Sequence, residues 1–354
     1  MARAAACAAS EARPATYQCN GNRIGLAHEP RCATAERLGR DFVLTAVEAE
    51  RLAWAAPSGP QRIAITGASG MIGSALGRFL AEGGHQVLPL VRGKGNGVNW
   101  DPEQGTIDAR ALEGIDAVVH LAGEPIAGKP WTPEFQAHAL RSREAGTLLI
   151  ARTIAGLERP PKVFVSASAV GYYGDGGDQW LDEASPSGSG YLAEVCRRWE
   201  AATEPAAKIR TVRARIGLVL SLAGGPLVDI LKPFRLGVGG AFGEGRQYMP
   251  WIAINDAVGA LHHAIFDPAL QGAVNLVAPH PERNRDFARI LGRVLRRPSF
   301  ATAPAFALRA ILGTQKANEL LLMGQRLRPA RLEQASFRFS YPELEPALRH
   351  LLGR

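Results

Sequence analysis

Residues 62–92 read RIAITGASGMIGSALGRFLAEGGHQVLPLVR, and they set the architecture of the chain. The β-branched run over 62–66 predicts a strand, the pattern after the glycines predicts a helix, and the apolar run over 87–91 predicts a second strand. Strand, glycine turn, helix and strand form the βαβ unit that binds a dinucleotide pyrophosphate at the helix N-terminus. We therefore expect a dinucleotide to bind at Gly67, Ser69, Gly70, Met71, Ile72 and Gly73.

The three glycines of this turn have different predicted roles. Gly67 permits the tight turn, Gly70 lets the backbone approach the phosphates, and Gly73 lets the helix pack closely on the strand. A glycine triplet alone is weak evidence, since most such triplets are ordinary turns. Here the strand before it and the helix after it are both predicted, which favours cofactor binding.

The end of the second strand indicates which dinucleotide binds. In this motif class an acid at that point contacts the ribose hydroxyls of NAD, whereas a cation accommodates the 2′-phosphate of NADP. The chain has Arg92, Gly93 and Lys94 there, with no Asp or Glu. An arginine fork matches a phosphate, although a solvated charge after a strand is the alternative interpretation. NADP is therefore favoured over NAD.

The composition narrows the classes of function. With 354 residues, 46% of them hydrophobic and 21% charged, the chain has the make-up of a soluble globular protein. No apolar run approaches the roughly 20 residues that a membrane span needs. The net charge of +8 is scattered among acids, which argues against a nucleic-acid partner. The four cysteines form no CxxC motif or metal-ligand cluster, so we expect no metal and a reduced, cytoplasmic setting.

The first 60 residues differ from the rest of the chain. They are rich in alanine, they lack the apolar core of a secretory signal, and they end in the linker-like APSGP of residues 56–60. Their acids argue against an organellar transit peptide. We expect a disordered extension, or a start codon placed too early, in which only residues 41–54 could form a short helix.

From residue 62 onward strands alternate with helices, which predicts an α/β fold with a doubly wound parallel sheet of the Rossmann type. The further predicted elements are strands over 117–123, 162–168 and 209–220, and helices over 133–157 and 191–202. Ligands of such sheets lie beyond the carboxyl ends of the strands. Leu121, Ala122 and Gly123 end one of these strands, so we expect them to contact the cofactor together with the glycine turn.

Three units follow the extension. We assign residues 61–222 to the NAD(P)-binding domain. After that the pattern breaks into loops rich in glycine and proline, mixed with helices and a short strand near 273–277. We assign residues 223–298 to a smaller α/β segment on the substrate side, and residues 299–354 to a helical C-terminal domain.

Several motifs resemble the extended, nucleotide-sugar-epimerase-like branch of the short-chain dehydrogenase/reductase superfamily. They are TGASGMIG at 66–73, HLAG at 120–123, VSASAVGYYG at 165–174 and WIAINDAV at 251–258. More narrowly, YLAEVCRRWE, RIGLVLS, GEGRQYMPWIAINDAVGA and the tail over 304–348 resemble the atypical NAD-dependent epimerase/dehydratase-like family, whose C-terminal domain of unknown function is of the DUF1731 type. The resemblance covers residues 62–352.

The resemblance implies a catalytic serine and tyrosine. Ser168 matches the serine at its strand end, with Ser166 one strand step further back as the alternative. Tyr191 matches the tyrosine that acts as general acid/base. The lysine expected four residues later is replaced by Val195, and an unperturbed tyrosine, with a pKa of about 10, is a poor base at neutral pH. A merely structural Tyr191 and a non-catalytic Ser168 are therefore the alternative interpretations.

Other polar residues offer further candidates, each with a structural alternative. Tyr172 and Tyr173 follow the serine strand and could supply a proton, and Arg215 could reach an anionic substrate or be a paired structural arginine. Asp256 could support the substrate loop or cap the next helix. His120 lies on a buried strand and is expected to be a core residue.

Two functions are consistent with these features. The first is an NADP(H)-dependent oxidoreductase or epimerase-like enzyme that acts on an unidentified small molecule, with Ser168 and Tyr191 as its catalytic residues. The second is an NADP(H)-binding sensor or scaffold without turnover, which Val195 favours. Some relatives are associated with cell division, so the resemblance extends to such a regulatory role. Extended members often dimerise through the helices that flank the serine strand, which makes a homodimer one further expectation.

Overall fold

The computed structural model describes residues 16–19, 22–25, 59–93 and 95–354. Strands β1 (Thr16–Cys19) and β2 (Asn22–Gly25) form an antiparallel pair. The rest of the expected N-terminal extension, including the helix predicted over 41–54, lies outside the described residues, as does Lys94. Within the described ranges, no helix combines the length and the apolarity that crossing a membrane requires.

An eight-stranded sheet forms the centre of the fold, in the order β15-β10-β8-β7-β3-β4-β5-β6. All neighbouring strands are parallel except the edge pair of β5 and β6. The strands are β3 (Arg62–Thr66), β4 (Gln86–Val91), β5 (Val98–Asp101), β6 (Thr106–Ile107), β7 (Ala117–His120), β8 (Val163–Ala169), β10 (Arg210–Ile216) and β15 (Gly272–Leu276). The predicted doubly wound parallel sheet is confirmed, and its strand order reverses between β3 and β7.

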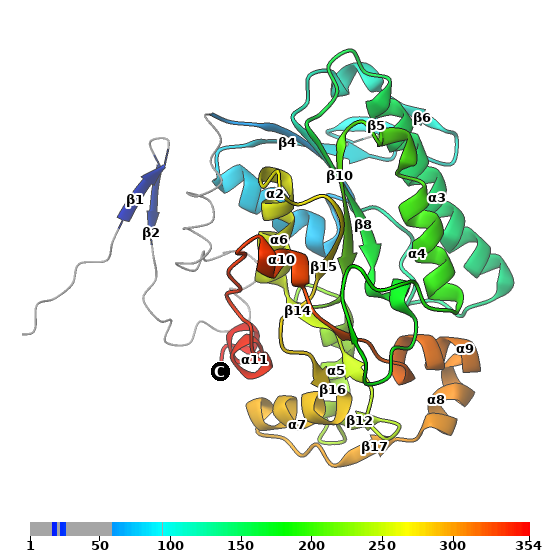
Figure 1. Ribbon diagram of the computed structural model, residues 1–354. Helices are drawn as coiled ribbons and strands as arrows, with labels where there is room; N and C mark the ends of the chain where they lie inside the picture. The colour runs from blue at the N-terminus through cyan, green and yellow to red at the C-terminus, as the bar shows by residue number, and fades with distance from the viewer. Residues whose placement is uncertain (1–15, 20–21, 26–58, 94) are drawn as a thin grey trace, which may run out of the picture.

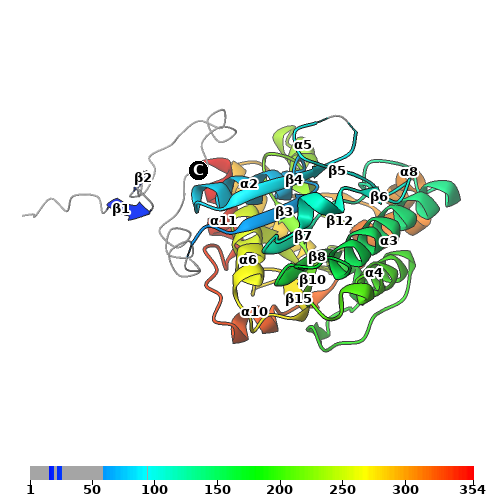
Figure 2. The ribbon, with the colours of Figure 1, turned by 90° about the horizontal axis from the view of Figure 1, so that it is seen from above.

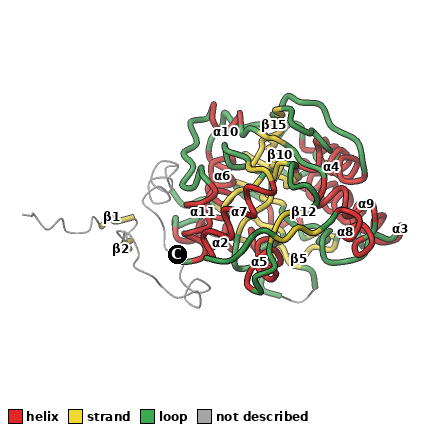
Figure 3. The backbone as a smooth tube through the Cα atoms, turned by 90° about the horizontal axis from the view of Figure 1, so that it is seen from below, coloured by secondary structure: helices red, strands yellow, loops and turns green. Residues whose placement is uncertain are grey.

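Helices cover both faces of this sheet, as Figure 1 and Figure 2 show. Helices α2 (Met71–Glu82) and α6 (Ile254–Phe266) lie on one face, and α3 (Pro133–Ala155) and α4 (Tyr191–Ala201) lie on the other. Figure 3 shows the strands between these two groups from the opposite side. Helix α3 begins after Thr132, whose hydroxyl accepts the N–H of Phe135, and it ends two residues before the predicted boundary.

The strand predicted over 209–220 is in fact two strands. It divides at Gly217 into β10 and β11 (Leu218–Leu220), and β11 pairs with β14 (Trp251–Ala253) in a separate two-stranded sheet. A Cβ atom on Gly217 would lie 2.2 Å from the carbonyl oxygen of Pro250, so only glycine allows the chains to approach there. The short strand predicted near 273–277 is β15, and it belongs to the main sheet as the neighbour of β10 rather than to the smaller segment.

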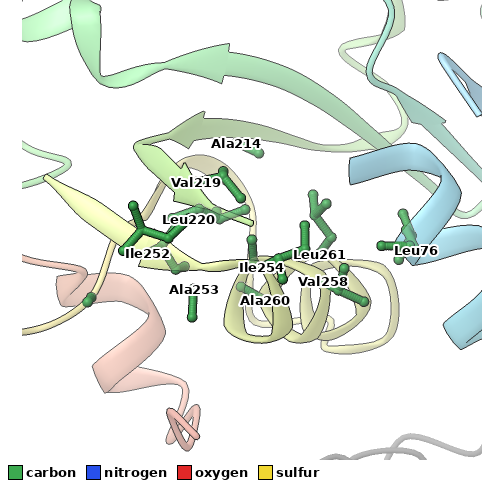
Figure 4. Packing of buried hydrophobic residues seen from close by; sticks show 14 of the residues in the cluster. Leu76, Ala214, Val219, Leu220, Ile252, Ala253, Ile254, Val258, Ala260 and Leu261 are labelled. Atoms are coloured by element: carbon green, nitrogen blue, oxygen red, sulfur yellow. The ribbon is translucent and has the colours of Figure 1, made fainter. Parts of the chain in front are cut away.

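Helix α6 joins these two sheets through a continuous hydrophobic core. Its side chains Val258 and Leu261 belong to one buried cluster with Leu76 of α2, Ala214 of β10 and Ile252 of β14. Figure 4 shows Val258 and Leu261 on the side toward Leu76, and Ile252 on the other side beside Leu220. The helix is buried nearly all round, as is expected of a helix inside a core. Burying each such aliphatic side chain contributes about 1.5–3 kcal/mol, so this core fixes residues 251–266 against the sheet.

The remaining elements gather mainly beyond one end of the sheet, drawn lowest in Figure 1. The helices at this end are α5 (Pro226–Arg235), α7 (Asn284–Leu295), α8 (Ala305–Leu312) and α9 (Thr314–Ala317). Helix α10 (Ala330–Gln334) instead packs beside β15, and α11 (Leu344–Leu352) packs against α7. The short strand pairs are β9 (Trp180–Leu181) with β18 (Arg326–Leu327), β12 (Gly240–Phe242) with β17 (Ala301–Ala303), and β13 (Tyr248–Met249) with β16 (Glu282–Arg283). Short helical turns are η1 (Ala109–Leu112), η2 (Val170–Tyr173), η3 (Glu204–Ala206) and η4 (Asn318–Leu322).

Asp256 ties the C-terminal segment to α6. It lies in the first turn of α6, is fully buried, and its carboxylate accepts the backbone N–H groups of Ser340 and Tyr341 at 2.7 and 2.8 Å. The charged acceptor strengthens both hydrogen bonds. Asp256 therefore anchors a distant segment of the chain to the first turn of α6, whose N-cap residue is Ala253.

Candidate functional site

The glycine turn has the geometry of an anion cradle. Gly67 has a φ of 67°, and a Cβ atom on it would lie 3.0 Å from the backbone nitrogen of Ala122. A Cβ atom on Gly73 would lie 2.2 Å from the carbonyl oxygen of Gly67. Helix α2 begins without a side-chain cap and without an acid in its first turn, and Ser69 and Gly70 are exposed in front of it. Its first N–H groups are therefore free to bind an anion.

Thr66 fixes the end of β7 against this turn. Its hydroxyl oxygen accepts the N–H groups of Leu121 and Ala122 at 3.1 and 3.2 Å and lies 2.7 Å from Nδ1 of His120. Because the oxygen accepts two donors, its own proton points to Nδ1. Burial, with a smaller effect from the charge of Arg143, lowers the pKa of His120 to about 3. His120 is thus a neutral core residue, as expected.

A pocket of about 490 Å³ opens beside the turn, at the carboxyl ends of β4 and β7. Arg92 lines it, together with Ala122 and Gly123, so the structure brings three of the predicted cofactor residues together. Its other lining residues are Trp100, Pro102, Glu103, Glu124, Pro125, His138, Arg141, Ser142 and Ala145. The carboxylate of Glu124 is paired with Lys129 at 2.7 Å.

Sequence reasoning missed part of this pocket. Trp100 comes from β5, while His138, Arg141, Ser142 and Ala145 come from α3. The four α3 residues recur at spacings of three, one and three, which place them on one helix face. That periodicity was present in the sequence, but only the fold shows that the face borders the end of β7.

Ser168 belongs to a buried polar network. Its side chain is 2% exposed, and its hydroxyl donates to Oε1 of Glu200 at 2.8 Å. Glu200 also accepts Nε and Nη2 of Arg215 at 2.8 and 2.9 Å, in a two-point ion pair. The alternative interpretation of Arg215 as a paired structural arginine is therefore correct. Ser166 is buried one step further back and donates to the carbonyl oxygen of Ala167.

The two tyrosines after the serine strand extend this network. Nη1 of Arg215 donates to the Tyr173 hydroxyl at 2.9 Å, and that hydroxyl donates to Oδ1 of Asn275 at 2.7 Å. Burial raises the pKa of Tyr173 to about 12, against the opposing charge of Arg215. The ring of Tyr172 lies 3.4 Å from the guanidinium carbon of Arg215. Both rings thus surround a structural ion pair.

Tyr191 lies at the start of α4 and has other partners than Ser168. Its hydroxyl donates to the carbonyl oxygen of Gln136 on α3 at 2.9 Å, and its ring meets Trp131 edge-on at 5.0 Å. Burial raises its pKa, although the charge of Arg143 opposes this. Val195, four residues later, is 1% exposed and apolar. The structure therefore places Ser168 and Tyr191 on the same side of the sheet without joining their hydroxyls.

Comparison with known proteins agrees with this geometry. The family model described as the NAD dependent epimerase/dehydratase family matches residues 63–213, and the domain of unknown function DUF1731 matches residues 303–351. An epimerase family protein of Mycobacterium bovis is 41% identical over 297 residues, which cover 82% of this chain and 98% of that protein. The epimerase family protein SDR39U1 of Homo sapiens is 37% identical over 297 residues, which cover 82% of this chain and 100% of that protein.

Solved structures of epimerase family proteins are also similar to this chain. The crystal structure of human SDR39U1 with NADPH has a TM-score of 0.77 at 36% identity, and the match covers 83% of this chain and 99% of that one. A nucleoside-diphosphate sugar epimerase from Corynebacterium glutamicum has a TM-score of 0.72 at 36% identity, covering 86% of this chain and 62% of that one. The chain belongs to the NAD-dependent epimerase/dehydratase family, in the group of epimerase family proteins that carry a C-terminal DUF1731 domain.

Proposed function

We propose that this chain binds NADP(H) across the carboxyl ends of β3, β4 and β7 and acts on an unidentified small molecule as an epimerase-like oxidoreductase. The observation that carries the proposal is the uncapped, acid-free N-terminus of α2 behind Gly67 and Gly73. A dinucleotide pyrophosphate fits it because the backbone N–H groups and the helix dipole favour an anion there. The human relative whose structure contains NADPH supports the same cofactor class.

The residues that would hold the cofactor divide into two groups. The turn would hold the pyrophosphate and the end of β7 would flank it, through Gly67, Ser69, Gly70, Met71, Ile72, Gly73, Leu121, Ala122 and Gly123. Arg92 would bind the 2′-phosphate, with Arg141 in the same pocket as a second cation. When bound, the nicotinamide supplies or accepts a hydride. NADP over NAD is thus proposed from the presence of Arg92 where NAD-specific sites carry an acid.

The proposed catalytic roles belong to Ser168 and Tyr191. With its pKa raised by burial, Tyr191 holds its proton at neutral pH and suits the role of proton donor rather than base. It would have to leave the carbonyl oxygen of Gln136 to reach a substrate. Ser168 would orient the substrate only if its hydroxyl turned away from Glu200.

These same contacts favour a second candidate, an NADP(H)-binding sensor or scaffold without turnover. Both hydroxyls already have partners, and Val195 leaves the usual lysine position apolar. A role linked to cell division belongs to this alternative. A homodimer formed through α3 and α4 and a cytoplasmic location stay predictions. The division into a substrate-side segment over 223–298 and a C-terminal domain over 299–354 is likewise a proposal.

A turnover assay separates the two candidates. NADPH oxidation would be followed with a panel of carbonyl compounds and a metabolite extract, for the wild type, Ser168→Ala and Tyr191→Phe. The enzyme proposal predicts oxidation in the wild type that falls by about 100-fold or more in Tyr191→Phe, while NADPH binding is retained. Tight NADPH binding with no oxidation by any compound would contradict it and favour the sensor.

A further inference from the structure

Arg143 is a buried arginine without a directly paired acid among the described residues, although the charge of Glu124 acts on it from a distance. It lies on the inward face of α3, is 8% exposed, and its Nε is fully buried without a hydrogen-bond partner. Its Nη1 donates to the carbonyl oxygen of Ala139 at 3.1 Å, and its guanidinium carbon lies 4.9 Å from the ring of Trp199. Among the described residues, no carboxylate forms an ion pair with it. A buried cation without a direct ion pair, and with one N–H group unsatisfied, is costly, so such a group calls for a functional explanation.

The guanidinium of Arg143 lies next to the backbone of Gly123, at the edge of the sheet where ligands bind. A Cβ atom on Gly123 would lie 3.4 Å from the Arg143 guanidinium carbon and 3.5 Å from its Nη2. Gly123 lines the pocket that contains Arg92. Arg143 itself lies toward α4, because it packs on Trp199, and α4 contacts β8. The positive charge of Arg143 and that of Arg92 therefore flank the same strand end from different sides.

Helix α4, all of whose residues the structure describes, contains no buried cation. Its buried side chains include Val195, Cys196 and Trp199, and Figure 2 shows α3 and α4 side by side on one face of the sheet. Within the described part of α4, Arg197 and Arg198 are exposed and pair with Glu194 and Glu144. His120, which ends β7 three residues before Gly123, is neutral. Arg215 of β10 is also buried on this side, but Glu200 neutralises it. Among the described residues on this side, Arg143 is therefore the buried cation without a directly paired carboxylate.

A dinucleotide bound at the proposed site would lie close to the positive charge of Arg143. With its 2′-phosphate at Arg92 and its pyrophosphate at the turn, its second ribose would lie across the reversal of strand order, on the side of β8 and α4. We propose that Arg143 binds the hydroxyls of the nicotinamide-side ribose and is the cation of that half of the site. This inference rests on the proposed function, and it assigns to α3 a contact that the apolar Val195 of α4 cannot make.

The role of Arg143 is tested by comparing the binding of two ligands that share the adenosine half but differ in the nicotinamide half. NADPH contains both ribose groups, whereas adenosine 2′,5′-bisphosphate lacks the nicotinamide half. Arg143→Met is expected to weaken NADPH binding by about 10- to 100-fold, the range for a lost hydrogen bond to a charged donor, and to leave bisphosphate binding within about twofold. Arg92→Ala should weaken both ligands. Arg152→Met, an exposed arginine at the end of the same helix, is the matched control and should change neither.

Arg143→Met leaves no acid unpaired, so it should fold, which thermal unfolding without ligand would check. Arg143→Lys keeps the charge and should retain NADPH binding within about tenfold. If the methionine variant does not fold, Arg143→Gln replaces it as the variant without the charge, and it is compared with Arg143→Lys. Unchanged NADPH binding in the charge-removing variant, or an equal loss for both ligands, would overturn the role of Arg143 alone. A wild type that binds neither ligand would overturn the proposed function and this inference together.

Discussion

Replacing Gly73 by alanine tests the cradle in front of α2 most sharply. The added Cβ atom would lie 2.2 Å from the carbonyl oxygen and 2.8 Å from the carbonyl carbon of Gly67, and these backbone atoms cannot rotate away. Since real Cβ atoms essentially never approach within 3.0 Å, the helix or the turn must move by about 1 Å. We expect a loss of about 1–3 kcal/mol in the free energy of unfolding, as for other overpacked sites. NADPH binding should weaken by about 100-fold, since the N–H groups no longer converge on the phosphates.

Gly77→Ala is the matched control, one turn further along the same helix. Its Cβ atom would meet only the Cγ1 atom of Val87 at 3.9 Å, an ordinary contact. Alanine is favoured over glycine inside a helix, so this variant should be about 0.5–1 kcal/mol more stable and bind NADPH like the wild type. Urea unfolding and a fluorescence titration measure both quantities. Wild-type stability and affinity in Gly73→Ala would refute the reasoning.

Three further predictions concern stability. Ser168→Ala removes a donor from the buried Glu200 carboxylate and should lower the free energy of unfolding by about 1–3 kcal/mol in urea; no change would show that this hydrogen bond is not structural. Asp256→Ala leaves the N–H groups of Ser340 and Tyr341 without their acceptor, so limited proteolysis should cut near residue 340 faster, and equal rates would contradict the anchoring role. Folding lowers the pKa of His120 from 6.5 to about 3, so the unfolded chain binds the extra proton and stability should fall as pH falls through that range. His120→Gln should flatten this dependence, and an unchanged slope would argue against a neutral buried His120.

The central sheet and the glycine turn could be predicted from the sequence because local rules determine them. The order of strand, glycine turn and helix from residue 62 fixes a βαβ unit, and Arg92 follows the second strand directly. The position of Leu121–Gly123 at the sheet edge followed from the same logic. Parallel strands end at one edge, so residues that end predicted strands must lie near each other.

Features that depend on distant contacts could not be predicted in this way. The break at Gly217 arises from the approach of Pro250, and the strand near residue 273 joins the main sheet because it pairs with β10. The hydrogen bond from Ser168 to Glu200 links residues 32 positions apart, and the hydrogen bond from Tyr191 to Gln136 links residues 55 positions apart. Sequence spacing predicted both hydroxyls as site residues, but packing decides which partners they have.

The most direct test of the central claim is an equilibrium titration of the wild type and of Arg92→Ala with NADPH and with NADH. We predict that the wild type binds NADPH about 10- to 100-fold more tightly than NADH, as expected for a charged hydrogen bond to the 2′-phosphate. Arg92→Ala should lose this preference while it still binds both dinucleotides. Failure of the wild type to bind either dinucleotide would contradict the cofactor site itself, and a preference that survives in Arg92→Ala would contradict the role of Arg92.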